Sequence, residues 1–174
     1  MDPLDTVAAE DDLRFPSGPW TGFYLQCWVP GRHTMTIELE FASGQLDAKG
    51  VDIVGPFTFR GDYDSTDGKC RWIKQYLGRH RVTYSGVNEG QGIWGVWEIR
   101  ALAGLYVDRG VFHIWPQGMS PAKEADATVQ AYLSHLRSRA LFRLAKFAVC
   151  SALGYAAFLL VKHLAYAWTG VNVP

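Results

Sequence analysis

Short segments separated by turn residues dominate residues 20–116, and this spacing restricts the fold of that region more than any other feature. A turn signal recurs about every 8 to 12 residues, which is typical of antiparallel sheet and leaves no length for crossover helices. The clearest strand covers residues 34–41, where apolar and polar side chains alternate. Alternation predicts one buried and one solvent-facing side, and the side we expect to be buried consists of Met35, Ile37, Leu39 and Phe41.

The same reasoning predicts seven further strands, at residues 20–28, 45–51, 57–63, 69–77, 81–87, 93–100 and 110–115. Eight strands in meander order indicate an antiparallel up-and-down barrel, because closure pairs the edges that an open sheet exposes. A two-layer sandwich is the alternative. Glycine permits sharp coiling while a ring fills a narrow interior, so the barrel is favoured by four glycines that an aromatic follows one or two positions later: Gly22, Gly61, Gly95 and Gly110.

Five different motifs lie along residues 18–116: Gly18-x-Trp20-x-Gly22-Phe23-Tyr24, Gly50-x-Asp52-x-x-Gly55-Pro56-Phe57, Lys74-x-Tyr76-x-Gly78-Arg79-His80-x-Val82-x-Tyr84-x-Gly86, Ile93-x-Gly95-x-Trp97-Glu98-Ile99 and Phe112-x-Ile114-Trp115-Pro116. Together they resemble a family of small, largely uncharacterised bacterial all-β domains. The Gly-x-Trp and Gly-x-Tyr strands are also loosely similar to avidin-like and lipocalin-like (calycin) barrels. The resemblance implies a barrel but no ligand, because the chain has no full lipocalin signature and no biotin-binding set of polar residues.

Charge is distributed unevenly, although the 17 basic and 17 acidic side chains cancel. Residues 1–12 contain acids and no base, and residues 13–126 are balanced. We therefore expect an acidic tail without a fold of its own over residues 1–16 and a β-barrel domain over residues 17–117. The balanced charge of the middle part excludes a nucleic-acid partner. After position 126 every charged residue is basic: Arg137, Arg139, Arg143, Lys146 and Lys162.

A long helix is expected at the C-terminus. Ser120 is a good N-cap and Pro121 suits the first helical position, and no further proline follows before about Trp168. Residues 147–161 are uncharged, with basic side chains on both flanks and with Tyr166 and Trp168 suited to an interface. The pattern predicts an amphipathic juxtamembrane helix over 120–146, a transmembrane helix over 147–168 and a short tail over 169–174. A core or oligomer-forming helix of a soluble protein is the alternative.

The basic residues before the predicted span outnumber those after it, so the positive-inside rule places the barrel in the cytoplasm in a single-pass arrangement. Within the bilayer, Ala148, Ala152 and Ala156 form a row of small residues that favours a homo-oligomer. The three cysteines lack CxxC spacing, and we expect them to be reduced. A disulfide between Cys27 and Cys70 remains an alternative.

Polar side chains with chemical potential are concentrated in residues 74–84. In a barrel, Lys74, Tyr76, His80 and Tyr84 are candidates to point into the mouth and bind an anionic or carbonyl-bearing ligand, with Arg79 beside them. A small enzyme is the alternative, with His80 as the general base. Asp52 or Glu98 would orient its imidazole. The simpler interpretation is that Arg79 and His80 occupy a solvated turn.

No cofactor or metal motif is present. The chain lacks a Gly-x-x-x-x-Gly-Lys loop, a Gly-x-Ser-x-Gly elbow and a His-Glu-x-x-His helix. His33, His80 and His113 are sufficient in number for a metal site, but their spacing does not support one. We therefore expect neither a cofactor nor a metal.

Aromatic side chains occur on both faces of several predicted strands, so one set must point outward. Trp94 and Trp115 would then form an unusually apolar outer face that needs a cover. The candidates are a second copy of the chain, a foreign partner, and the start of the C-terminal helix, whose apolar stripe contains Val129, Tyr132, Leu133 and Leu136. The leading hypothesis is a membrane-anchored, non-catalytic barrel that binds a small ligand or a protein through this face. A self-assembling membrane scaffold is a third alternative.

Overall fold

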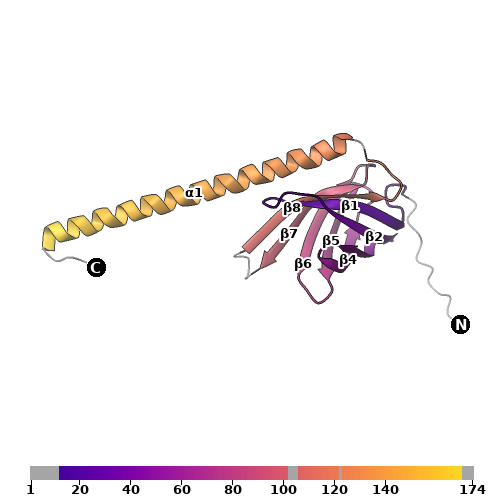
Figure 1. The fold of residues 1–174 in the computed structure, drawn as a ribbon, viewed down its shortest axis with the longest axis horizontal. Coiled ribbons are helices and arrows are strands. Elements are labelled where there is room, and N and C mark those ends of the chain that lie inside the picture. The colour runs from indigo at the N-terminus through magenta and orange to yellow at the C-terminus, as the bar shows by residue number, and fades with distance from the viewer. Residues whose placement is uncertain (1–11, 102–105, 122, 170–174) are drawn as a thin grey trace. The chain divides into compact units, whose positions relative to one another are not determined.

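The computed structural model describes residues 12–101, 106–121 and 123–169. Its strands form a closed antiparallel barrel in which each strand pairs with its neighbours in the chain and β1 also pairs with β8 (Figure 1). The predicted barrel is confirmed, and the sandwich is excluded. The strands are β1 (Gly18–Gln26), β2 (His33–Ala42), β3 (Gln45–Asp52), β4 (Gly55–Tyr63), β5 (Lys69–Tyr76), β6 (Arg81–Asn88), β7 (Ile93–Ala101) and β8 (Tyr106–Pro116).

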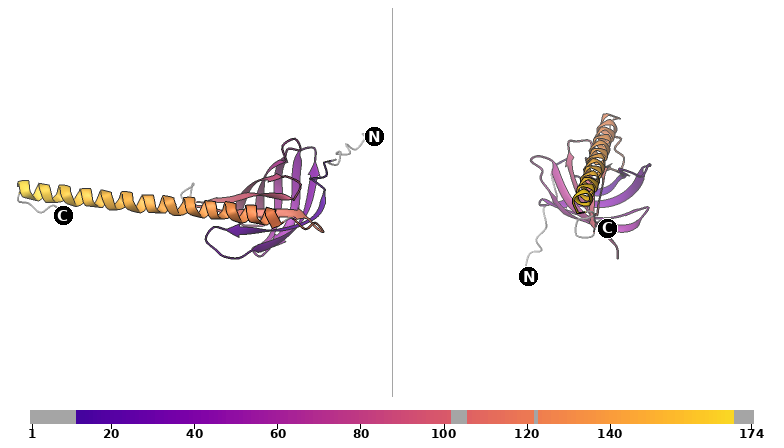
Figure 2. Two further views of the ribbon diagram at one scale, coloured as in Figure 1. Left: turned by 90° about the horizontal axis from the view of Figure 1, so that it is seen from above. Right: turned by 90° about the vertical axis from the view of Figure 1, so that its left-hand side faces the viewer.

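The strand boundaries agree with the sequence-based expectation within two residues, except at the start of β8. β1 ends at Gln26, so that Trp28 lies in the following loop instead of the strand. β8 begins four residues earlier than expected, because its ladder with β7 continues to the pair formed by Ala101 and Tyr106. Figure 2 shows the strands curving around the barrel from two further sides.

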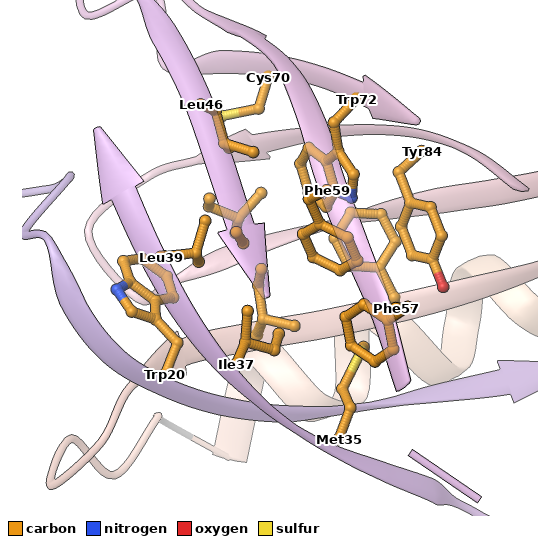
Figure 3. Packing of buried hydrophobic residues seen from close by; sticks show 14 of the residues in the cluster. Trp20, Met35, Ile37, Leu39, Leu46, Phe57, Phe59, Cys70, Trp72 and Tyr84 are labelled. Atoms are coloured by element: carbon orange, nitrogen blue, oxygen red, sulfur yellow. The ribbon is translucent and has the colours of Figure 1, made fainter. Parts of the chain in front are cut away.

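The interior of the barrel is filled by side chains. Met35, Ile37, Leu39 and Phe41 are buried as predicted, while the residues between them face solvent. Aromatic rings from four other strands complete the packing, and Figure 3 shows several of them. The centroids of contacting rings lie 4.8–5.8 Å apart among Phe57, Phe59, Trp72, Tyr84 and Phe112. The interior is therefore a packed aromatic core.

Glycines make room for rings from adjacent strands. A Cβ at Gly110 would lie 1.9 Å from the carbonyl oxygen of Leu25 and 2.6 Å from the ring of Trp97. A Cβ at Gly50 would lie 2.5 Å from the ring of Phe57. At Gly110 and Gly50 the ring that needs the space belongs to the neighbouring strand. At Gly22 and Gly95, two glycines of the sequence pattern, the nearest atoms belong to the neighbouring backbone and to Ile114.

The alternating strand directions give the barrel two distinct ends. We call one the polar end; its hairpin loops are residues 43–44, 64–68 and 89–92. We call the other the apolar end; its described loops are residues 27–32, 53–54 and 77–80. A hydrogen bond from Arg79 Nη1 to the carbonyl oxygen of Val54, 3.0 Å long, joins two loops of the apolar end.

A side chain from the segment before β1 plugs the polar end. Phe15 is fully buried, and its ring lies 4.8 Å from that of Tyr63 and 5.3 Å from that of Phe41. Asn88 Nδ2 donates to the carbonyl oxygen of Arg14 and fixes the segment. Residues 1–11 of the predicted tail lie outside the described residues, but Phe15 belongs to the core.

The C-terminal helix is α1 (Lys123–Thr169), a single helix of 47 residues. The chain divides into two compact units, the first ending at Ser134 and the second beginning at His135. In the first unit, Val129 and Leu133 are buried and the ring of Tyr132 lies 6.3 Å from that of Trp94. Because an isolated helix cannot bury its own side chains, the first turns of α1 pack on the outside of the barrel.

The second unit contains the predicted span. Its helix is long and apolar enough to cross a membrane, and none of the residues in the apolar stretch is buried within the protein. The cysteines carry no disulfide: Cys27 and Cys70 are both free and buried, and Cys150 is free and exposed.

Candidate functional site

Lys74 lies inside the barrel because it occupies an inward position of β5, on the same face as Cys70, Trp72 and Tyr76. Its side chain is completely buried. Nζ lies 2.5 Å from Oδ2 of Asp52, and the hydroxyl of Tyr76 donates to the same oxygen at 2.6 Å. Two strands that are not neighbours, β3 and β5, thus contribute a buried ion pair. The phenol of Tyr76 is hydrogen-bonded to the same carboxylate.

Asp52 connects this ion pair to the loop of the apolar end. Its carboxylate is fully buried at the end of β3, and Oδ1 accepts a hydrogen bond of 2.8 Å from the backbone N–H of Val54. Both oxygens are therefore bonded, one to the turn that follows β3 and one to Lys74 and Tyr76. This geometry suits a fixed counter-ion.

Aromatic rings surround the ammonium group of Lys74. Nζ lies 3.7 Å from the ring centroid of Phe57, 4.7 Å from that of Tyr76 and 5.3 Å from that of Tyr24. Such rings attract a cation through their negative faces. The surroundings of Lys74 therefore compensate part of the cost of removing its charge from water.

Burial shifts the protonation equilibria of the whole cluster. Burial lowers the pKa of Lys74 to about 8, although the hydrogen bond and charge of Asp52 act in the opposite direction. Burial also raises the pKa of Tyr24 to about 12, and it raises the pKa of Tyr76 and of Tyr84. At neutral pH Lys74 is mostly charged and the three phenols are neutral.

The predicted residues 74–84 divide between the inside and the outside of the barrel. Lys74, Tyr76 and Tyr84 lie inside, and Tyr84 stacks on Trp72 with a centroid distance of 5.3 Å. Arg79 and His80 are exposed in the loop of the apolar end. The imidazole of His80 lies 5.0 Å from the ring of Tyr76 and so touches the cluster only from outside.

Of the two acids considered for orienting His80, neither is arranged for that purpose. Asp52 is bonded to Lys74, Tyr76 and Val54. Glu98 faces outward on β7, where it forms ion pairs with Arg109 at 2.5 Å and with Arg100. The enzyme hypothesis needs His80, Lys74 and an acid to converge. Instead, Lys74 pairs with Asp52, and His80 is not part of that pair.

The outer aromatic face lies over β1, β7 and β8. Trp94 and Trp115 are half-buried there. The ring of Trp115 lies 6.0 Å from that of Phe23 and 5.0 Å from that of His113, while Trp94 contacts Tyr132 of α1. Of the three covers considered from the sequence, the start of α1 is in contact with this face.

The three histidines considered for a metal lie in separate surroundings. His33 stacks against Tyr24 with a centroid distance of 4.9 Å, and His80 lies in the loop of the apolar end. His113 is fully buried, with Nε2 2.7 Å from the carbonyl oxygen of Gln91. Over the described ranges 12–101, 106–121 and 123–169, no three His, Cys, Asp or Glu residues are grouped to hold a metal ion.

Sequence reasoning placed Asp52 beside His80 and missed its bond to Lys74. The available signal was the alternation of β5, which puts Lys74 on the same face as Cys70 and Trp72. A lysine at an inward position needs a counter-ion. A hollow opens on the surface beside Asp52, lined among others by Arg32, His33 and Ile53.

Comparisons with known proteins give no relative: no family model matches the chain, and no curated protein or solved structure matches it.

Proposed function

We propose that this protein is a membrane-anchored, single-pass β-barrel that acts as a non-catalytic binding module. The observation that carries the proposal is that the polar groups of Lys74, Asp52 and Tyr76 inside the barrel are already bonded to one another. Lys74, the inward cation, is already bonded to Asp52, and aromatic rings occupy the surrounding space. A group that is saturated in this way serves structure better than turnover, so we assign binding to the outside of the barrel.

Membrane anchoring is supported by the second unit. Apolar side chains on all sides of a helix are stable in lipid but costly in water. Phe147, Leu153, Phe158 and Leu160 are each more than half exposed within the protein. The excess of basic residues before the apolar run favours a cytoplasmic barrel.

The enzyme alternative has less support. A general base needs a substrate proton within hydrogen-bond reach and a partner that orients the imidazole. His80 packs on the ring of Tyr76 from the solvent side, and the carboxylates of Asp52 and Glu98 are engaged elsewhere. An interior ligand of the calycin kind has less support as well, because it would have to displace the rings that now fill the barrel.

The experiment that tests anchoring is carbonate extraction of membranes from cells that express the full chain. We expect the protein to stay in the membrane pellet. Replacing both Leu153 and Leu159 by arginine places two charges in the apolar run and should release the protein. The matched control replaces Leu141 and Leu144 by arginine, outside that run, and should leave the protein in the pellet. Recovery of the unaltered chain as a soluble monomer would contradict the proposal.

Binding without catalysis is tested by copurification of the detergent-solubilised full chain with its native partners and metabolites. His80→Ala should leave the amount of each copurified partner or metabolite unchanged within a few-fold. If the unaltered protein converts one of these metabolites and His80→Ala abolishes that conversion, the enzyme alternative is favoured instead.

A further inference from the structure

The apolar end of the barrel exposes large hydrophobic side chains at the tip of each described loop. Ile53 is 78% exposed, Leu77 61%, Trp28 54% and Val29 47%. These side chains come from three separate loops that meet at one end of the barrel. Isolated apolar side chains are normal on a protein surface, but a group gathered at one end indicates a contact with something apolar.

The same loops carry positive charge and no acid. Arg32 and Arg79 lie in them with His80, and neither residues 27–32, 53–54 nor 77–80 contain Asp or Glu. The carboxylate of Asp52, the nearest acid in the chain, is turned inward and buried. The outer surface of this end therefore combines apolar tips with cationic heads.

The polar end has the opposite character. Its hairpin loops contain Asp64, Asp67 and Glu89 and no large apolar side chain, although Leu13 is exposed in the adjoining N-terminal segment. The segment before β1 also lies at this end, since Asn88 Nδ2 donates to the carbonyl oxygen of Arg14. The barrel is thus polarised along its axis.

We propose that the apolar end docks on the surface of an anionic bilayer, with Ile53, Leu77 and Trp28 entering the interfacial region. This inference rests on the proposed membrane anchoring and adds an orientation to it. Apolar and aromatic tips beside arginines suit the interface, where the rings and aliphatic chains leave water and the guanidinium groups meet lipid phosphates. Anionic lipid attracts arginines that are held near its surface. The acidic polar end would be repelled from the same surface.

The helix between the barrel contact and the apolar run is about as long as β7 beyond that contact. Tyr132 contacts Trp94, and β7 continues for seven residues from Trp94 to Ala101 at the apolar end, which is about 23 Å of strand. Fifteen residues of helix separate Tyr132 from Phe147, where the apolar run starts, which is about 22 Å.

Spin labels in the full chain test the orientation. In a Cys150→Ala background, Ile53→Cys at the apolar end and Ser65→Cys at the polar end are labelled separately; Cys27 and Cys70 are buried. Each protein is reconstituted into vesicles of phosphatidylcholine with about a third phosphatidylserine, an amount chosen to give a strongly negative surface. Collisions with oxygen report lipid, and collisions with a water-soluble nickel complex report solvent. We expect position 53 to be in the interface and position 65 in water.

Charge removal then tests the role of lipid headgroups. Arg32→Gln with Arg79→Gln should move the label at position 53 toward water severalfold, as should vesicles of phosphatidylcholine alone. Arg71→Gln, on the outside of β5 away from these loops, is the control and should have no effect. Near-ultraviolet circular dichroism checks that each variant is folded.

Three outcomes would overturn the docking proposal. A protein that floats with the vesicles while both labels stay in water is anchored but not docked, so the proposed function survives alone. Poor access of both reagents to position 53, with spin–spin broadening, would mean that a second copy covers the apolar end. A protein that does not float with anionic vesicles contradicts docking and anchoring together.

Discussion

The two ends of the barrel distribute charge and apolar surface in opposite ways. At the polar end an apolar ring, Phe15, closes the interior and charged side chains face water. At the apolar end the ion pair of Lys74 and Asp52 lies inside, whereas Ile53 and Leu77 lie outside. The polar end follows the rule for a protein surface in water, and the apolar end reverses it. This difference is the strongest sign that the two ends meet different environments.

The largest effect is expected from a change in the core that both ends share. Ile37→Asp would bury a carboxylate without a partner, which costs more than a typical domain can supply, and the barrel should not fold. Thr36→Asp, on the exposed side of the same strand, should be tolerated. Circular dichroism and size-exclusion chromatography of the solubilised chain compare the two. Equal effects would show that the assignment of faces in β2 is wrong.

Breaking the buried ion pair should come next. Lys74→Met leaves the Asp52 carboxylate buried without its cation, and we expect a loss of about 3–5 kcal/mol in the free energy of unfolding. The double variant Lys74→Met with Asp52→Asn removes both charges and should recover most of that loss. Denaturant unfolding of the solubilised chain measures the cycle. Additive losses in the double variant would mean that the two residues do not stabilise the fold as a pair.

A comparison of apolar side chains at the two ends sharpens the contrast. Phe15→Ala should open a cavity at the polar end and lower the free energy of unfolding by about 3–5 kcal/mol. Ile53→Ala should change it by less than about 0.5 kcal/mol, because the Ile53 side chain is exposed and makes no core contact. The same unfolding measurement applies. A large loss for Ile53→Ala would show that this side chain serves packing instead of an external contact.

The ion pair also predicts a pH dependence. Burial lowers the pKa of Lys74 to about 8 from its ordinary 10.5, so between these values the unfolded chain holds more protons at this position than the folded barrel does. The contribution of Lys74 to stability therefore rises with pH through this window. Between pH 7.5 and 9.5 the original chain should gain about 1–2 kcal/mol relative to the double variant. A gap that stays constant or moves the other way would contradict the lowered pKa that burial gives Lys74.

The smallest effect is expected in the bilayer. Ala148, Ala152 and Ala156 lie one turn apart on α1, and we propose that they allow two helices to pack closely. Ala152→Ile should weaken a dimer severalfold without changing membrane residence, as measured by energy transfer between labelled chains in vesicles. Ala157→Ile, on a different face of the helix, is the control. An unchanged oligomeric state in both variants would remove this part of the proposal.

The sequence predicted the local features well, because they depend on neighbours in the chain. The alternation at Met35–Phe41 specified a buried face, and turn residues specified a meander that closes into a barrel. The ion pair was beyond its reach: Asp52 and Lys74 belong to strands separated by β4, so their meeting depends on the curvature of the closed sheet. The polarity of the two ends was likewise visible only once the loops had been assigned to ends.

The sidedness of the barrel and of the C-terminal tail decides whether the chain crosses the membrane once. In a Cys150→Ala background, Ser65→Cys marks the barrel and Asn172→Cys marks the C-terminal tail. A membrane-impermeant maleimide is applied to sealed, right-side-out vesicles from cells expressing the full chain. A single-pass protein with a cytoplasmic barrel predicts labelling at position 172 in intact vesicles and at position 65 only after permeabilisation. Labelling of both positions in intact vesicles would contradict the membrane-spanning account.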